Sequence, residues 1–149
     1  MIMSENIRLS LDQMHEQADK DLKLDKSQLL IESIKTPTLF SKWSKMLSVE
    51  RLILYKIISE LEAKELDTFE YYRGKSDPEV YKERPFGHKV LKCDMDKYIK
   101  ADPEISKLKQ RLALQKEKVD TIERTLKAIN DRQWIIRNAN ESNRFEAGS

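Results

Sequence analysis

Glycine, proline and cysteine are scarce in this chain, and their scarcity excludes several kinds of site. The 149 residues include three glycines, four prolines and a single cysteine, Cys93. No glycine-rich phosphate loop can be found, which argues against nucleotide hydrolysis of the usual kind. One cysteine forms no intrachain disulfide, and with only His15 and His88 beside it the ligands of a structural zinc site are too few. We therefore expect no metal site and no cofactor.

Long apolar runs are missing as well. No stretch approaches the roughly 18 apolar residues that a membrane span needs. The start of the chain, "MIMSENIRLS", has neither the basic beginning nor the apolar core of a signal peptide. We expect a soluble intracellular protein that has no membrane partner.

A catalytic constellation is also absent from the sequence. Cys93 has only His88 near it, five residues away in a basic stretch. The many carboxylates alternate with lysines, as they do on any solvated helix face. We therefore expect that the chain is not an enzyme and has no catalytic residues.

Charge, by contrast, is abundant and uneven. Charged residues make up 36% of the chain and hydrophobic residues 39%, which is typical of a helical protein with a thin core. The net charge is only +2, but residues 73–118 carry 13 bases against 8 acids. Residues 1–35 carry 5 bases and 7 acids, residues 36–72 carry 5 bases and 6 acids, and residues 119–149 carry 5 of each. The positive excess is therefore confined to the segment that begins at Arg73.

Apolar spacing predicts helices throughout the first half of the chain. Residues 4–35 are expected to form one broken or two short helices, with Asp25 and Gln28 as a capping box before the apolar positions that follow. Thr36 and Pro37 then resemble an N-cap and a first helical residue.

From Pro37 to about Tyr72 apolar residues recur at three- and four-residue steps without a glycine or a further proline. This spacing predicts one long amphipathic helix with Trp43 on its apolar side. Gly74 is well placed to end it, because glycine readily takes the left-handed conformation found at helix C-termini.

The region from Gly74 to Ala101 is the one loop-like stretch of any size, with a helical turn expected near residues 94–100. Asp102 and Pro103 then repeat the start signal, the first as a cap and the second at the first helical position. A last helix is therefore predicted from Pro103 onward.

That last helix carries a heptad pattern. Its a and d positions alternate by three and four residues for five repeats, with Gln115, Gln133 and Asn140 as polar interruptions. Either this seam packs in a helical hairpin against the 37–72 helix, or it joins copies of the chain, and both hold if one face serves each. Trp134 and Ile135 lie off the seam and suggest a second surface to bury. The residues expected to support oligomerisation are Leu108, Leu112, Val119, Ile122, Leu126, Ile129 and Ile136.

Between residues 71 and 100 aromatic and basic residues alternate. Cations neutralise phosphates, and aromatic faces stack on exposed bases, so this combination suits single-stranded nucleic acid. The alternative is a solvated loop whose tyrosines pack on neighbouring helices. Lys42 and Lys45 flank Trp43 and either extend the basic surface or merely neighbour a core position. No recognition helix stands out, so binding to a duplex is not favoured.

Three short motifs carry a resemblance to a known family. "SKW" at 41–43, "YYRGKSD" at 71–77 and "RFEAG" at 144–148 are similar, in order and spacing, to motifs of the UvsY family, the recombination mediator proteins of T-even-type phages. The stretch "VLKCDMDKYIKADPEISKL" also resembles that family. The resemblance covers most of the chain from about Arg8 onward.

The resemblance implies an all-helical protomer that assembles into a ring-like homo-hexamer or homo-heptamer. It implies a recombination mediator that binds single-stranded DNA and helps load a phage RecA-like recombinase onto strands coated by the phage single-strand DNA-binding protein. Such a protein would act in recombination-dependent replication and repair, in the cytoplasm of the infected bacterial host. It would have no catalytic activity of its own.

One departure from the family pattern affects the expected DNA contacts. The family carries a lysine and an arginine just before the paired tyrosines, and here those positions hold Leu66 and Thr68, with only Lys64 near. The bases after Tyr72 would have to compensate. The full set of residues expected to bind DNA is Lys42, Lys45, Lys64, Tyr71, Tyr72, Arg73, Lys75, Lys82, Arg84, Lys89 and Lys92.

We therefore expect two functional regions. Residues 1–101, with a basic aromatic loop at about 73–101, would bind DNA and partner proteins, and residues 102–149 would hold the oligomer together. The rival hypothesis is a structural coiled-coil adaptor without any nucleic-acid role, whose basic loop serves only solubility. A salt-sensitive association with an oligonucleotide separates the two.

Overall fold

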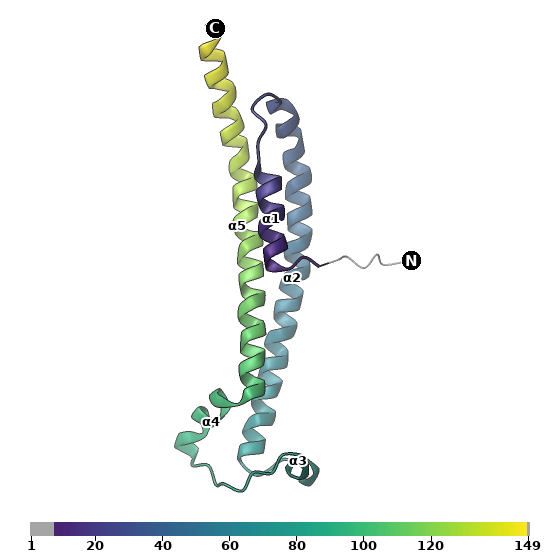
Figure 1. The fold of residues 1–149 in the computed structure, drawn as a ribbon, viewed down its shortest axis with the longest axis vertical. Helices are drawn as coiled ribbons and strands as arrows, with labels where there is room; N and C mark the ends of the chain where they lie inside the picture. Colours follow the sequence, from purple (N-terminus) through teal and green to yellow (C-terminus); the bar gives the residue numbers. More distant parts are fainter. Residues whose placement is uncertain (1–7, 149) are drawn as a thin grey trace, which may run out of the picture. The chain divides into compact units, whose positions relative to one another are not determined.

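The computed structural model describes residues 8–148, and within that range the chain is built only of helices, turns and loops (Figure 1). This confirms the predicted all-helical class. The chain divides into two compact units. Unit 1 holds the residues up to Arg51 and those from Glu117 onward, and unit 2 is Leu52–Lys116. The elements are α1 (Leu11–Leu22), α2 (Leu29–Tyr72), α3 (Pro78–Glu83), the 3-10 turn η1 (Lys92–Asp94), α4 (Met95–Ala101) and α5 (Pro103–Glu146).

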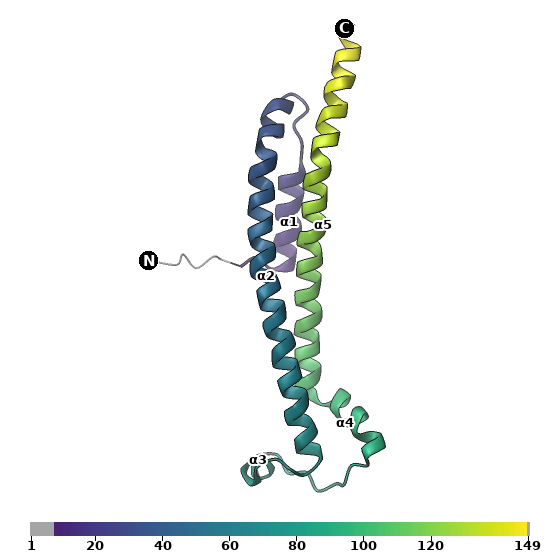
Figure 2. The same ribbon diagram turned by 180° about the vertical axis from the view of Figure 1, so that it is seen from behind.

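In unit 1 the short helix α1 lies alongside α2 and α5, as seen from opposite sides in Figures 1 and 2. A capping box starts α1, because the Ser10 hydroxyl accepts from the Gln13 amide and the Gln13 side chain accepts from the Ser10 amide. Two residues of α1, Met14 and Ala18, are buried. They join Trp43, Ile122 and Ile129 in one apolar core.

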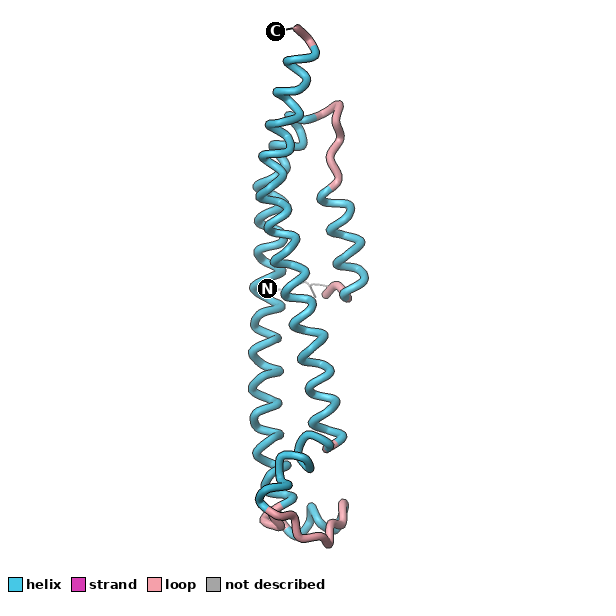
Figure 3. Tube along the Cα trace, turned by 90° about the vertical axis from the view of Figure 1, so that its left-hand side faces the viewer, coloured by secondary structure: helices cyan, strands magenta, loops and turns pink. Residues whose placement is uncertain are grey.

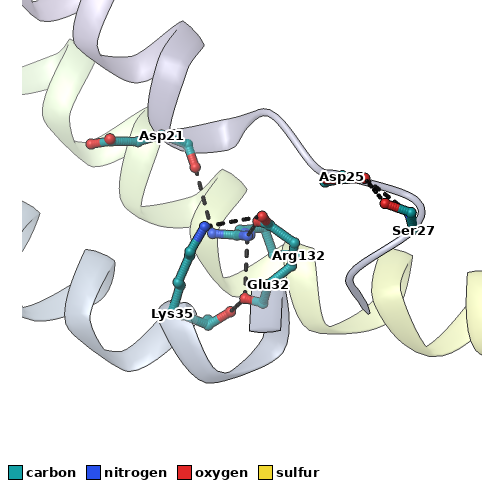
Figure 4. A network of polar contacts seen from close by, with 7 residues as sticks. Asp21, Asp25, Ser27, Glu32, Lys35 and Arg132 are labelled. Atoms are coloured by element: carbon teal, nitrogen blue, oxygen red, sulfur yellow. Dashed lines mark hydrogen bonds and ion pairs between the residues drawn. The ribbon is translucent and has the colours of Figure 1, made fainter. Parts of the chain in front are cut away.

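A charged network is buried beside this core (Figure 4). The guanidinium of Arg132, whose side chain is 2% exposed, donates to the Glu32 carboxylate at 2.5 Å and to the Glu32 carbonyl at 3.3 Å. It also reaches the Asp21 carbonyl at 3.5 Å, so α5 is joined to both α1 and α2. A buried ion pair adds little to stability compared with an apolar substitute, but removing one partner leaves a buried charge unpaired. The network therefore favours one arrangement of the three helices.

Asp21 ties α1 to α2 at the same place. Its carboxylate accepts from Lys42 at 2.6 Å and from the indole of Trp43 at 2.9 Å. Burial alone would raise the pKa of Asp21, but the hydrogen bonds from Lys42, Trp43 and Gln17 outweigh burial and lower it. Trp43 was expected on the apolar side of its helix, and it is fully buried.

The predicted start of a helix at Thr36–Pro37 is wrong. Helix α2 begins at Leu29 and continues through Pro37. Proline removes one backbone donor from the helix, but the turn before it is held by tertiary contacts. The Glu32 carbonyl accepts from the Thr36 hydroxyl at 3.4 Å and from Arg132. Arg132, which is distant in sequence, thus helps to hold the helical turn before the residues that were predicted to start the helix.

The predicted capping box at Asp25 and Gln28 is also wrong. Asp25 accepts from the amide and the hydroxyl of Ser27, at 2.9 and 2.6 Å, and its carbonyl accepts from the Gln28 amide. Asp25 therefore forms a turn in the connection between α1 and α2, which Figure 3 shows as a loop. The helix begins only after Gln28.

The far end of α2 behaves as predicted. Gly74 has φ +77°, its amide donates to the Tyr71 carbonyl and the Lys75 amide donates to the Glu70 carbonyl. These two bonds are the Schellman arrangement, which satisfies carbonyls that the helix end leaves free. Glycine is required here because a left-handed backbone strains any residue with a Cβ.

Asp102 and Pro103 start α5 as predicted. The Asp102 carboxylate accepts from the amides of Glu104 and Ile105, at 3.0 and 3.4 Å. In unit 2 the segments of α2 and α5 lie side by side, joined by ion pairs of Arg111 with Glu60 and of Lys64 with Glu104. Between them the chain forms α3, η1 and α4, and α4 coincides with the expected helical turn.

Much of the heptad seam is buried inside the protomer itself. Ile122 and Ile129 are fully buried in the unit 1 core, and Val119 and Ile136 are 6% and 4% exposed. In unit 2, Leu108 and Leu112 are partly buried. Within each unit, therefore, the seam meets the chain's own helices, as the hairpin alternative supposed. The contribution of these residues to self-association stays a prediction.

Candidate nucleic-acid interface

Unit 2 is organised by an aromatic cluster at the end of α2. Tyr71, Tyr72 and Met95 are buried in it, and Phe69, Tyr81, Phe86, Val90 and Ile99 pack around them. The rings of Tyr71 and Tyr72 meet edge to face with centroids 5.0 Å apart, and Tyr81 stacks on Tyr71 at 5.3 Å. Such pairs stabilise a cluster beyond the area they bury.

Hydrogen bonds from the phenols fix the chain that follows. The Tyr71 hydroxyl donates to the Arg84 carbonyl at 3.0 Å, and the Tyr81 hydroxyl donates to the Tyr71 carbonyl at 2.7 Å. The Tyr81 oxygen also accepts from the Ser76 amide at 3.3 Å. Helix α3 is thereby held against the C-terminal end of α2, which positions the basic segment that begins there.

Asp102 is the second anchor of this region, with a side chain that is 0% exposed. Besides capping α5, its carboxylate accepts from the Tyr72 hydroxyl at 2.9 Å and from Arg84 at 3.1 Å. Burial would raise the pKa of Asp102, but hydrogen bonds from Tyr72, the Glu104 amide and Arg84 together lower it. The pKa of Tyr72 is raised, first by burial and then by this bond to Asp102. Asp102 is therefore an anion held in place by three elements.

A groove of about 930 Å³ opens beside the aromatic cluster. Four exposed cations and one exposed carboxylate border it, and buried or half-buried apolar and aromatic side chains form its floor. Its lining is Phe69, Tyr72, Arg73, Gly74, Lys75, Phe86, Gly87, His88, Lys89, Val90, Lys92, Met95 and Asp96. We call it the basic groove. Arg73 also lies over the ring of Phe69, 4.9 Å from its centroid. A groove with cations at its rim and apolar rings in its floor can hold phosphates and bases together.

The positive charge does not cover unit 2 evenly. A second groove, of about 620 Å³, is lined by five carboxylates and three cations. The carboxylates are Asp67, Glu70, Asp77, Glu83 and Glu104. We call it the acidic groove. Lys75 lines both grooves, and the excess of carboxylates makes the acidic groove the less favourable of the two for a polyanion.

The four predicted bases Arg73, Lys75, Lys89 and Lys92 are brought together by the basic groove although they lie in two stretches of sequence. None of the four forms an ion pair with another described residue. Their DNA contact stays a prediction, but the fold supplies a common surface for them.

Three other predicted bases are engaged elsewhere. Lys42 pairs with Asp21 at 2.6 Å, Lys64 pairs with Glu104, and Arg84 pairs with the buried Asp102. Lys45 and Lys82 are exposed but lie outside the basic groove. The structure therefore divides the predicted set, with a group of four in one groove and the others apart from it.

The paired tyrosines are mainly structural in this conformation. Tyr71 and Tyr72 are 5% and 8% exposed, and both hydroxyls are used within the fold. The alternative that the tyrosines pack on neighbouring helices therefore describes them well, and base stacking on them stays a prediction. Tyr72 lines the groove although it is buried, and Phe86 and His88 line it with more of their surface exposed. Their sequence signal was the alternation "RPFGHK", which puts aromatic rings directly between bases.

The two positions that depart from the family pattern differ in their surroundings. Leu66 is 60% exposed, whereas Thr68 is only 5% exposed. A base at position 68 of this chain would lie at a buried site, so the pattern could not simply be restored by substitution. The cations of the basic groove follow these positions in the sequence.

Two absences hold for the described residues. No group of three or more histidines, cysteines or carboxylates among residues 8–148 is arranged to hold a metal ion. No described helix is both long and apolar enough to cross a membrane. Cys93 is exposed and forms no disulfide.

The fold and the groove define a small all-helical protein with a binding surface suited to an unpaired nucleic-acid strand. Comparison with known sequences is more specific. The sequence model of UvsY, described as a recombination, repair and ssDNA binding protein, matches residues 17–149. The chain therefore belongs to the UvsY family.

Individual relatives agree over nearly their whole length. The recombination protein uvsY of Enterobacteria phage T4 is 24% identical over 140 residues, which cover 94% of this chain and 99% of the relative. Crystal structures of the bacteriophage T4 recombination mediator protein UvsY share the fold. The lattice type II structure has a TM-score of 0.83 at 24% identity and covers 93% of this chain and 98% of its own. The lattice type I structure has a TM-score of 0.80 at 23% identity, and the match covers 89% of this chain and 98% of the crystallised chain.

Proposed function

We propose that this chain is a recombination mediator that binds single-stranded DNA in the basic groove and helps load a RecA-like recombinase onto strands coated by a single-strand DNA-binding protein. It would act in recombination-dependent replication and repair, in the cytoplasm of a phage-infected bacterium. The observation that carries the proposal is the meeting of Arg73, Lys75, Lys89 and Lys92 around one groove with an apolar floor.

The chemistry of the groove supports a strand with free bases over a duplex. Phosphates release counterions when lysine and arginine neutralise them, and this drives binding without regard to sequence. The apolar floor, with Phe86 and Met95, can take up a base only if that base is not already paired. The aromatic cluster and Asp102 hold the groove's two stretches together before any ligand arrives.

Assembly strengthens such a site. We propose a homo-hexamer or homo-heptamer in which each copy contributes one basic groove. Linked weak sites bind far more tightly than one site when a strand can reach several of them together. In unit 1, Leu30, Ile34, Trp134 and Ile135 are exposed large apolar residues, between 54% and 74% exposed, and would be covered in the assembly.

The test is a double charge reversal in the groove with a matched control. Lys89→Glu/Lys92→Glu should weaken binding of a fluorescein-labelled oligothymidylate by at least about tenfold at moderate salt. It should also flatten the plot of log affinity against log salt, which falls by about 0.7 per neutralised phosphate for single strands. Fluorescence anisotropy at several salt concentrations measures both effects.

Lys107→Glu/Lys109→Glu is the control, because it changes the net charge equally at two exposed lysines of unit 2 that do not line the groove. Its affinity should fall by less than about threefold, the effect of net charge alone. Equal losses in both double variants would overturn the groove as the binding site. No salt-sensitive binding by the unaltered protein would instead support a structural adaptor.

A further inference from the structure

We propose that an unpaired base enters the basic groove and packs against Phe86 and His88, while the neighbouring phosphates are held by the cations of the rim. This inference rests on the proposed function, and it assigns the base contact to two residues that precede and follow Gly87. It differs from the sequence prediction, in which Tyr71 and Tyr72 stacked on bases.

The tyrosines are less suited to the task because they are more deeply buried than Phe86, at 5% and 8% exposed, and their rings pack within the cluster. Tyr71 has Tyr81 stacked on it at 5.3 Å and the Arg84 guanidinium over it at 4.7 Å. Tyr72 meets Tyr71 and Phe86 edge to face, at 5.0 and 5.1 Å. A base could stack on either ring only after the cluster had opened.

Phe86 and His88 have the surroundings that a base contact needs. Phe86 is half-buried, supported by the edges of Tyr72 and Tyr98, so its position is fixed by the cluster. The imidazole of His88 is exposed and meets the Phe86 ring edge to face at 5.7 Å. No hydrogen bond or ion pair of His88 to another described residue is formed. Histidine and phenylalanine rings are both common stacking partners of unpaired bases.

Cations line the same groove from two stretches of the sequence. Lys89 directly follows His88, and Lys92 lies three residues further on, while Arg73 and Lys75 border the groove from the end of α2. The groove volume of about 930 Å³ is within the range of sites that hold small organic ligands. Asp96 is the one carboxylate in the lining.

The test compares an oligothymidylate of 15 nucleotides with an abasic phosphodiester of the same length and charge, at one salt concentration. If bases contribute, the full-length protein should bind the oligothymidylate at least about fivefold more tightly, since stacking on a ring is worth that much or more per base. Phe86→Leu and His88→Ala should each reduce this preference while leaving affinity for the abasic strand within about twofold.

Tyr55→Leu is the matched control. Tyr55 is an aromatic residue of unit 2 that is 59% exposed and does not line the groove. This variant should keep the preference. If Phe86→Leu lowers the thermal stability strongly, His88→Ala decides alone, because His88 is exposed and supports no part of the core.

Failure of this inference and failure of the proposed function look different. If the unaltered protein bound the two strands with equal affinity, the base contact would be overturned. If Lys89→Glu/Lys92→Glu weakened the binding of both strands, the proposal that the groove binds the strand would still stand. A preference that survives both Phe86→Leu and His88→Ala would also overturn it. If the unaltered protein bound neither strand, the proposed function would fail and the inference with it.

Discussion

Units 1 and 2 are built from the same two long helices but are held together by different means. Unit 1 has an apolar core around Trp43, Ile122 and Ile129, locked by the buried pair of Arg132 and Glu32. Unit 2 has an aromatic cluster and a single buried anion, Asp102, which collects hydrogen bonds from three elements. The first arrangement is that of a scaffold, whereas the second leaves cations free at its surface.

This difference shows how one repetitive helical sequence separates two tasks. Where the charges of unit 1 are buried, they face each other and set the packing of α1, α2 and α5. Those of the basic groove in unit 2 face outward and can meet a ligand. A substitution in either unit should therefore disturb the interactions that hold that unit together.

The largest effect is expected from a charge in the unit 1 core. Ile129→Asp should abolish folding of unit 1, at about 4 kcal/mol or more, because Ile129 is 0% exposed and an unpaired carboxylate would be buried. Circular dichroism and thermal melting measure the loss. The same reasoning applies to Ile122. A charge at either heptad position should therefore unfold the protomer, whether or not these residues also contribute to assembly.

Ile135→Asp is the control, since that residue is 54% exposed on the same helix. It should leave the fold intact while lowering the mass of the oligomer in sedimentation. A stable Ile129→Asp protomer would contradict the assignment of the core.

A smaller loss is expected when the buried ion pair is broken. Glu32→Ala leaves the Arg132 guanidinium buried without its carboxylate, which should cost about 3 kcal/mol of unfolding free energy. The double variant Glu32→Ala/Arg132→Met should regain most of that loss, because no unpaired charge remains. Denaturant titration measures both, and a double variant no more stable than the single one would contradict this account.

In unit 2, Asp102→Asn should cost about 2 kcal/mol, because asparagine still caps a helix but loses the charge that binds Arg84. The pKa of Asp102 is lowered in the folded protein, so its stabilising effect is complete above about pH 3.9. The effect is lost as pH falls through the lower folded value. The stability gap between the unaltered protein and Asp102→Asn should therefore narrow in acid. If this difference in stability did not depend on pH, the charge of Asp102 would not be what stabilises unit 2.

The smallest effect is expected at the end of α2. Gly74→Ala should cost about 1 kcal/mol, because Gly74 has φ +77° although a Cβ there would meet no atom within 4 Å. Gly87→Ala also adds a methyl group in open space, but without a left-handed backbone, and should change stability by less than about 0.5 kcal/mol. Equal melting temperatures for the two variants would show that the left-handed backbone at Gly74 does not contribute to the stability of unit 2.

Local chemistry made part of this structure predictable. Gly74, Asp102 and Pro103 act through their own backbone and immediate neighbours, so their roles could be predicted from residue type and position. The helical class followed in the same way from apolar spacing. Thr36 and Pro37 failed as a helix start because Arg132, almost a hundred residues away, holds the turn before them.

The candidate site was predictable only as a set of residue types. Alternating rings and bases indicated the right segment, but a periodic sequence does not show which rings will be buried by one another. Tyr71 is buried because Tyr81 of α3 stacks on it, and Tyr72 is buried by contacts that include Phe86, whereas His88 stays exposed. The pairing of Lys64 with Glu104 likewise depends on the meeting of two helices, which the linear spacing does not contain.

The most direct test of the central claim is photo-crosslinking of an oligothymidylate to the unaltered protein, followed by mapping of the crosslinked peptides. We expect crosslinks in unit 2, at residues 73–75 and 86–92, which include most of the lining of the basic groove. Crosslinks confined to unit 1, around Lys42 and Lys45, would contradict it.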